Sequence, residues 1–127
     1  RQRQMCIRDR FIAHQDTPFC NERSGTLDDT LFYLALLRLM LPNVLLPATT
    51  ALGTIHPRGR EMGVLSGANV VMPNLSPVSV RKKYMLYDGK ICTGDEAAEC
   101  RMCLSRRMER IGCEVVTDRG DYKKRLA

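Results

Sequence analysis

Residues 44–73, VLLPATTALGTIHPRGREMGVLSGANVVMP, decide the fold that we expect for this chain. The stretch opens and closes on short apolar segments, 44–48 and 68–73, in which apolar residues do not alternate with polar ones. That pattern is typical of strands covered on both faces. Between them, residues 58–66 predict a helix that ends at Gly67. Strand, helix and strand in this order indicate a parallel pair joined by a crossover helix.

The upstream sequence adds a further unit of the same kind. RFIAHQDTP at 10–18 is typical of an apolar strand that runs into a polar loop, and residues 27–41 predict a helix capped by Ser24 or Thr26. Because this helix is apolar on most of its circumference, we expect a sheet and neighbouring helices to cover it. Residues 49–57 are expected to form a loop. The fold class is therefore α/β, and since three strands cannot close a sheet alone, we expect part of a larger fold.

Composition limits the functional class. The 127 residues are 44% hydrophobic, which is enough for a buried core, and they carry a formal charge of +6. The sequence contains no apolar N-terminal segment of secretory type and no uninterrupted run long enough to span a membrane. We therefore expect a cytoplasmic protein with no membrane partner. Its six cysteines are then expected to be reduced thiols or metal ligands rather than disulfides.

The first ten residues, RQRQMCIRDR, account for half of the net charge. They show no periodicity and resemble the translation of a sequencing-library adapter. We therefore interpret residues 1–10 as an assembly artefact or, alternatively, as a disordered basic arm. Because no aromatic residues are interleaved with the arginines, neither interpretation indicates nucleic-acid binding.

Polar or small residues follow each predicted strand, and in a parallel barrel the chemistry lies at those strand ends. Thr49 and Thr50 offer two hydroxyls and nearby backbone N–H groups that could receive an anion, although threonine after a strand is also an ordinary cap. His14 and Asp16 could share a face of an extended loop, either as a hydrogen-bonded pair that fixes the loop or as acid and base. The candidate strand-end residues are His14, Asp16, Thr49, Thr50, Ala51 and Met72.

KICTGDEAAECRMC, residues 90–103, places Cys92, Cys100 and Cys103 at a C-x7-C-x2-C spacing. The apparent capping box TGDE starts a helix that runs to about residue 111, on which Cys100 and Cys103 share a face. Three thiolates suit an iron–sulfur cluster or zinc, and the alternative is two cysteines that pack inward with one in a loop. The arginines of this helix could offset cluster charge but are more simply interpreted as a solvated face: Arg101, Arg106, Arg107 and Arg110.

Several sequence blocks occur together and in order: FIAHQDTP, PATTALGT, GRE, GANVVMPN and DGKIC. Together they closely resemble the last part of the radical SAM barrel of the HydE-type FeFe-hydrogenase maturases, over residues 11–112. Ala13 and Gln15 replace two prolines of that family's first block. On this resemblance we divide the chain into residues 1–10, a barrel part at 11–91, a cysteine-bearing helix at 92–112 and a tail at 113–127.

The resemblance implies a (β/α)8 TIM-type barrel, of which this chain holds the C-terminal part, strands six to eight with their helices. It implies an enzyme, similar to biotin synthase, that uses a 4Fe–4S cluster to cleave S-adenosylmethionine reductively to a 5′-deoxyadenosyl radical. The implied substrate is a small iron–cyanide–carbonyl–cysteine complex, and the implied partners are other hydrogenase-maturation proteins. The resemblance places these residues in the substrate and cofactor cavity: His14, Asp16, Thr49, Thr50, Ala51, Met72 and Tyr84.

One departure from the family concerns its catalytic cluster. The C-x3-C-x2-C motif that binds this 4Fe–4S cluster is absent here, so this stretch holds no catalytic residue and is expected to be inactive alone. Some family members carry the C-x7-C-x2-C triad, which implies an accessory 2Fe–2S or 4Fe–4S cluster on Cys92, Cys100 and Cys103. Two alternatives stay open: the same region of biotin synthase or methylornithine synthase, and a small non-enzymatic iron–sulfur or zinc-binding protein.

Overall fold

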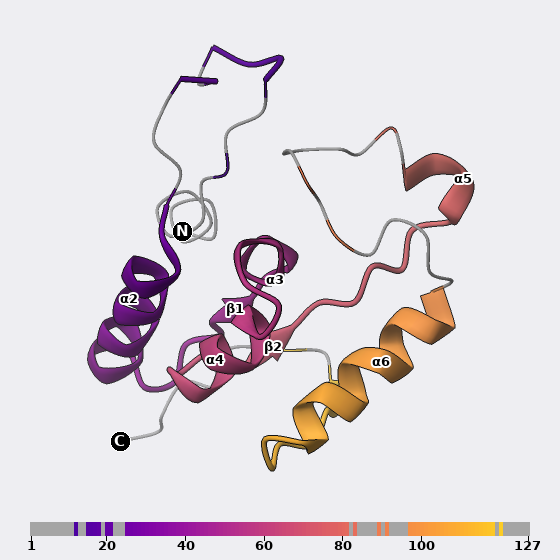
Figure 1. Cartoon of the computed structure of the whole chain (residues 1–127). Helices are drawn as coiled ribbons and strands as arrows, with labels where there is room; N and C mark the ends of the chain where they lie inside the picture. The colour runs from indigo at the N-terminus through magenta and orange to yellow at the C-terminus, as the bar shows by residue number, and fades with distance from the viewer. Residues whose placement is uncertain are drawn as a thin grey trace.

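Two short parallel strands form the sheet of the computed structural model (Figure 1). The structure describes residues 12, 15–18, 20–21, 25–81, 83, 89, 91, 97–118 and 120. β1 (Pro47–Ala48) pairs with β2 (Val70–Val71), so that Pro47 lies opposite Val70 and Ala48 opposite Val71. The predicted parallel strand–helix–strand unit is confirmed. The strand predicted around residues 11–13 lies almost wholly outside the described residues.

Helices precede, connect and follow this pair of strands. α2 (Leu27–Met40) precedes β1, α3 (Thr50–Ile55) and α4 (Gly59–Leu65) connect β1 to β2, and α5 (Val78–Arg81) and α6 (Ala97–Glu109) follow β2. In the view of Figure 1, α2 and α6 lie on opposite sides of the strands. Thr26 caps α2 as predicted, because its Oγ1 accepts the backbone N–H of Asp29 at 3.1 Å.

The strands are shorter than the predicted segments 44–48 and 68–73. Pro47 has no N–H to donate to a ladder, and the N–H of Leu46 donates at 2.8 Å to the side-chain oxygen of Asn69 instead of to a backbone carbonyl. A side chain thus takes the place of one ladder bond before β1, although the carbonyl of Leu46 still accepts the N–H of Val70 at 3.1 Å.

The loop predicted at residues 49–57 is wrong in part, because residues 50–55 form the helix α3. Threonine and glycine give this segment a low intrinsic helix propensity. However, Leu52 is fully buried, and α3 packs against α4. Burial of the short helix therefore outweighs the weak propensity of its residues.

The core lies between α2, α3 and the strands and contains Leu34, Leu46, Ala48, Leu52 and Ala68. Arg38 closes one end of it: its Nε donates to the carbonyl of Gly67 at 2.8 Å, and its Nη1 donates to the carbonyls of Pro42 and Val44 at 2.7 and 3.0 Å. Gly67 follows α4 with φ +117°, the left-handed conformation expected at a helix end. The end of α2 is therefore tied to the turn after α4.

The described residues cover the apolar helix α2 on one side. Thr30 and Leu34 are buried, whereas Phe32, Leu39 and Met40 are 64%, 81% and 67% exposed. We expected neighbouring elements to cover most of this helix, but within the described residues they cover a single face. No helix in the described part of the chain, α2 included, is long and apolar enough to cross a bilayer.

Candidate cavity edge and cysteine site

The ends of β1 and β2 bring two of the predicted cavity residues to one edge of the sheet. Because the strands are parallel and in register, their carboxyl ends lie side by side. Thr49 comes directly after β1 and Met72 directly after β2. Met72 is 45% exposed, so its side chain is accessible at this edge.

Thr49 carries a buried hydroxyl that makes no hydrogen bond to the described part of the chain. It precedes α3 with an extended backbone (φ −78°, ψ 168°), yet its side chain makes no capping hydrogen bond. Its Oγ1 is buried and has no hydrogen-bond partner among the described residues. Such a group costs about 1–3 kcal/mol, which a ligand that accepts the O–H would offset. Among the strand-end residues, this hydroxyl is the atom best suited to receive a polar ligand.

Of the remaining predicted cavity residues, the structure describes Thr50, Ala51 and Asp16. Thr50 starts α3, and its carbonyl accepts the hydroxyl of Thr54 at 3.1 Å. Ala51 is buried. Asp16 is exposed in the turn at residues 15–18. The other two, His14 and Tyr84, lie outside the described residues, so their position in the cavity stays a prediction.

The cysteine-bearing helix α6 divides its two thiols between two environments. Cys100, Leu104 and Met108, spaced four residues apart, are all buried, whereas Cys103 is exposed. The Sγ of Cys100 accepts the backbone N–H of Asn74 at 3.3 Å. Cys92 lies outside the described residues, and within those residues no three His, Cys, Asp or Glu side chains gather into a metal site.

The two described thiols nevertheless suit part of an iron–sulfur ligand set. Positions three apart on a helix are neighbours, and a backbone N–H that donates to a ligand sulfur is one of the features that tune such clusters. The buried Cys100 and the exposed Cys103 would place the group near the surface. A third ligand must come from elsewhere, and the sequence spacing predicts Cys92.

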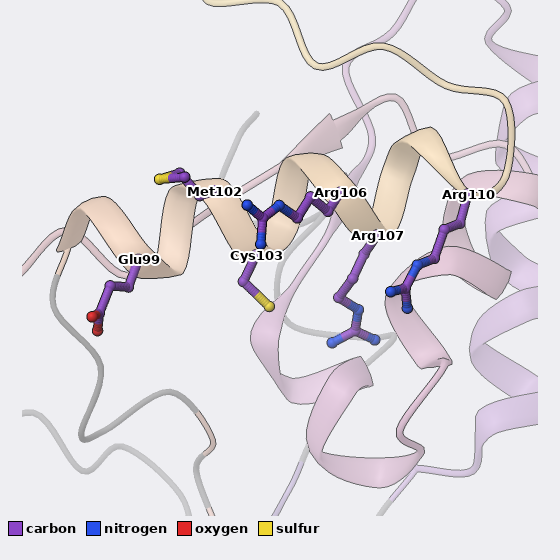
Figure 2. A pocket seen from close by; sticks show the side chains of 6 residues that line it. All are labelled: Glu99, Met102, Cys103, Arg106, Arg107 and Arg110. Atoms are coloured by element: carbon purple, nitrogen blue, oxygen red, sulfur yellow. The ribbon is translucent and has the colours of Figure 1, made fainter.

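A shallow groove runs beside Cys103, and Figure 2 shows the side chains along it. We interpreted the arginines of α6 as a solvated basic face, but the contacts of Arg107 in this groove differ from that interpretation. Arg107 donates from Nε and Nη2 to the two carboxylate oxygens of Glu61, both at 2.7 Å, and also to the carbonyl of Pro57. The interpretation is therefore wrong for Arg107, which joins α6 to α4. The groove is lined by Glu99, Met102, Cys103, Arg106, Arg107 and Arg110.

Sequence reasoning did not find Glu61 and Asn74 as partners of this helix. Glu61 lies 46 residues from Arg107, and Asn74 lies 26 residues from Cys100. Glu61 is 8% exposed. A buried carboxylate in a helix is a weak signal of a distant arginine, because such charges are rarely buried without a partner, but the sequence does not reveal which residues are buried.

Comparison with known proteins supports the resemblance inferred from the sequence blocks. No family model matches the chain. The chain is 45% identical over 114 residues, or 90% of its length, to the FeFe-hydrogenase maturase subunit HydE of Thermotoga maritima. The match covers 33% of that protein, so the chain spans about a third of the relative's length. The predicted resemblance to the HydE-type maturases is confirmed.

Proposed function

We propose that this chain forms the last strands and helices of the barrel of a radical SAM enzyme that matures FeFe-hydrogenase. The observation that carries the proposal is the 45% identity to HydE over 90% of the chain. The parallel pair β1–β2, with Thr49 and Met72 at its carboxyl edge, supports it, because barrel enzymes place their chemistry there. The exposed face of α2 also supports it, since a further barrel unit packed on that face would bury Phe32, Leu39 and Met40.

In this proposal the strand ends hold part of the cofactor or substrate. The hydroxyl of Thr49 donates to an anionic group, which Thr50 and Ala51 also approach, and Met72 contributes an apolar wall. S-adenosylmethionine and a 4Fe–4S cluster, when bound by the full-length protein, supply the reductive cleavage that starts the radical chemistry. His14, Asp16 and Tyr84 complete the cavity. The substrate is a small iron–cyanide–carbonyl–cysteine complex, and the protein works in the cytoplasm with other maturation proteins.

A chimera tests this function. The aligned 114 residues of this chain replace the corresponding third of Thermotoga maritima HydE, and the purified chimera is assayed for maturation of FeFe-hydrogenase in vitro. We expect hydrogenase activity well above that of a reaction without maturase. A chimera that folds and binds S-adenosylmethionine but yields no active hydrogenase would contradict the maturase function.

Thr49→Val in the same chimera isolates the buried hydroxyl. Valine keeps the shape and removes a polar atom that has no partner among the described residues, so the unfolding midpoint should stay unchanged or rise. The maturation rate should fall about tenfold, the effect of one good hydrogen bond to a ligand. Thr54→Val is the matched control: it removes a hydrogen bond to the carbonyl of Thr50 and should lower stability slightly while the rate is kept. If Thr49→Val kept the maturation rate and Thr54→Val lowered it, the role of Thr49 would be rejected.

We also propose that Cys92, Cys100 and Cys103 hold an accessory 2Fe–2S or 4Fe–4S cluster. After anaerobic reconstitution of the full chain with ferrous iron and sulfide, visible iron–sulfur absorbance is expected for the unaltered chain and for Cys113→Ser. Cys103→Ser should lose that absorbance, because it removes one of three ligands. If Cys103→Ser and the unaltered chain bind equal amounts of iron, this assignment is wrong.

A further inference from the structure

The segment that follows β2, residues 72–76, is held from one side by α5. Arg81 is 3% exposed; its Nε donates to the carbonyl of Ser76 at 2.7 Å, and its Nη2 donates to the carbonyl of Asn74 at 3.3 Å. The backbone N–H of Ser76 also donates to the side-chain oxygen of Asn74 at 3.3 Å. Charged donors form strong hydrogen bonds, so the α5 side of this segment is firmly fixed.

The same segment is also held by the cysteine helix α6. The Sγ of Cys100 accepts the N–H of Asn74 at 3.3 Å, and Cys100 is 3% exposed, so water does not compete for the sulfur. Removing this acceptor from a part-buried backbone donor costs more than the bond itself contributes. Leu104 and Met108 continue the buried face of the same helix.

We propose that Cys100 is a positioning residue for Met72, acting through Asn74, and that it couples the cysteine site to the cavity edge. Met72 is separated from Asn74 only by Pro73, whose ring fixes one backbone torsion and restricts the residue before it. A displacement at Asn74 is therefore transmitted to Met72 rather than absorbed between them. The inference rests on the proposed function, because it assigns two roles to the Cys100 sulfur. The sulfur is a ligand of the proposed cluster and the hydrogen-bond acceptor that fixes the position of residues 72–76.

The coupling has a consequence in each direction. Metal bound at Cys100 holds its sulfur in place, so loading of the cysteine site steadies residues 72–76 and the Met72 side chain. Because coupling between two sites is reciprocal, a ligand that orders Met72 favours the loaded state of the cysteine site. The cysteine site can in this way affect the cavity through the backbone of residues 72–76.

The test begins with the full chain without metal. Hydrogen exchange is measured by mass spectrometry on peptides that cover residues 72–76, and the methyl signal of Met72 is followed by NMR after its assignment with Met72→Leu. In Cys100→Ala, exchange of this segment should become at least about fivefold faster, and the Met72 signal should move. Cys100→Ser keeps an acceptor and should stay within about twofold of the unaltered chain. Cys113→Ser, a matched control outside the proposed ligand set, should change neither readout.

Equal exchange in Cys100→Ala and Cys100→Ser, or a Met72 signal that Cys100→Ala does not move, overturns the proposal. If Cys100→Ala fails to fold, Cys100→Val replaces it, because valine fills the site and offers no acceptor. After loading with ferrous iron and sulfide, exchange of residues 72–76 should slow in the unaltered chain and not in Cys103→Ser. The chain could lack iron–sulfur absorbance while Cys100→Ala still exchanges faster than Cys100→Ser. That result would contradict the accessory cluster alone and would support the positioning role.

Discussion

Replacing Gly59 with alanine is expected to lower the free energy of unfolding by more than about 3 kcal/mol. Gly59 is the first residue of α4, where that helix meets α3, and a Cβ at this position would lie 2.0 Å from the carbonyl oxygen of Leu52 and 2.7 Å from its carbonyl carbon. Because both are backbone atoms, no rotation of a side chain relieves the overlap. The two helices must move apart, and Leu52 must leave its buried position. Urea unfolding followed by circular dichroism measures the loss.

Helix propensity alone makes the opposite prediction, since alanine is favoured over glycine by about 1 kcal/mol within a helix. Gly112→Ala provides the control. No atom of the described residues lies within 4 Å of a Cβ at Gly112, and its left-handed backbone, with φ +77°, disfavours alanine. That substitution should therefore cost about 1–2 kcal/mol. If Gly59→Ala were as stable as the unaltered chain, α3 and α4 could not lie this close together.

Arg107→Ala is expected to cost about 2 kcal/mol at pH 7. The substitution leaves the carboxylate of Glu61 in a site where it is 8% exposed, and an uncompensated buried charge costs about 3–5 kcal/mol. Part of that is recovered here, because the side chains of Arg107 and Glu61 are still 22% and 10% exposed. Arg106→Ala is the matched control on the same helix. Arg106 is exposed, so the change should stay within about 0.5 kcal/mol.

The loss in Arg107→Ala should also depend on pH. Burial acts to raise the pKa of Glu61, but the hydrogen bonds it accepts, above all from Arg107, and the charges of Arg107 and Arg60 together lower the pKa below its ordinary 4.5. A carboxyl group with a lowered pKa stabilises the fold fully above its unfolded pKa and loses this effect as the pH falls through the folded value. The difference between Arg107→Ala and the unaltered chain should thus be full at pH 7 and shrink below about pH 4. If the two proteins differed equally in free energy of unfolding at pH 7 and below about pH 4, the ion pair would be contradicted.

The Arg107 ion pair also bears on the cysteine site. It fixes α6 against α4, and the same helix presents Cys100 to Asn74. A helix that separates from α4 would carry the Cys100 sulfur away from its donor. In Arg107→Ala we therefore expect the segment after β2 to lose part of its protection against hydrogen exchange as well.

Local signals in the sequence predicted much of the fold. The cap at Thr26, the turn at Gly67 and the parallel order of the strands around α4 were all visible, because capping, left-handed glycines and unalternated apolar runs each depend on a few neighbouring residues. The helix α3 was missed because its stability does not depend on its own residues alone. Its residues favour a loop, and the burial of Leu52 in a core shared with Leu34 and Ala68 makes the helical form the stable one.

The amino-acid sequence by itself therefore determined the α/β class, the resemblance to the HydE-type maturases, and the spacing of Cys92, Cys100 and Cys103. The tertiary structure alone decided which side chains have partners. It left the hydroxyl of Thr49 without one among the described residues, paired Arg107 with a carboxylate 46 residues away and placed the sulfur of Cys100 against the N–H of Asn74. Burial and pairing of polar atoms depend on which distant segments pack together, and no local pattern encodes those contacts.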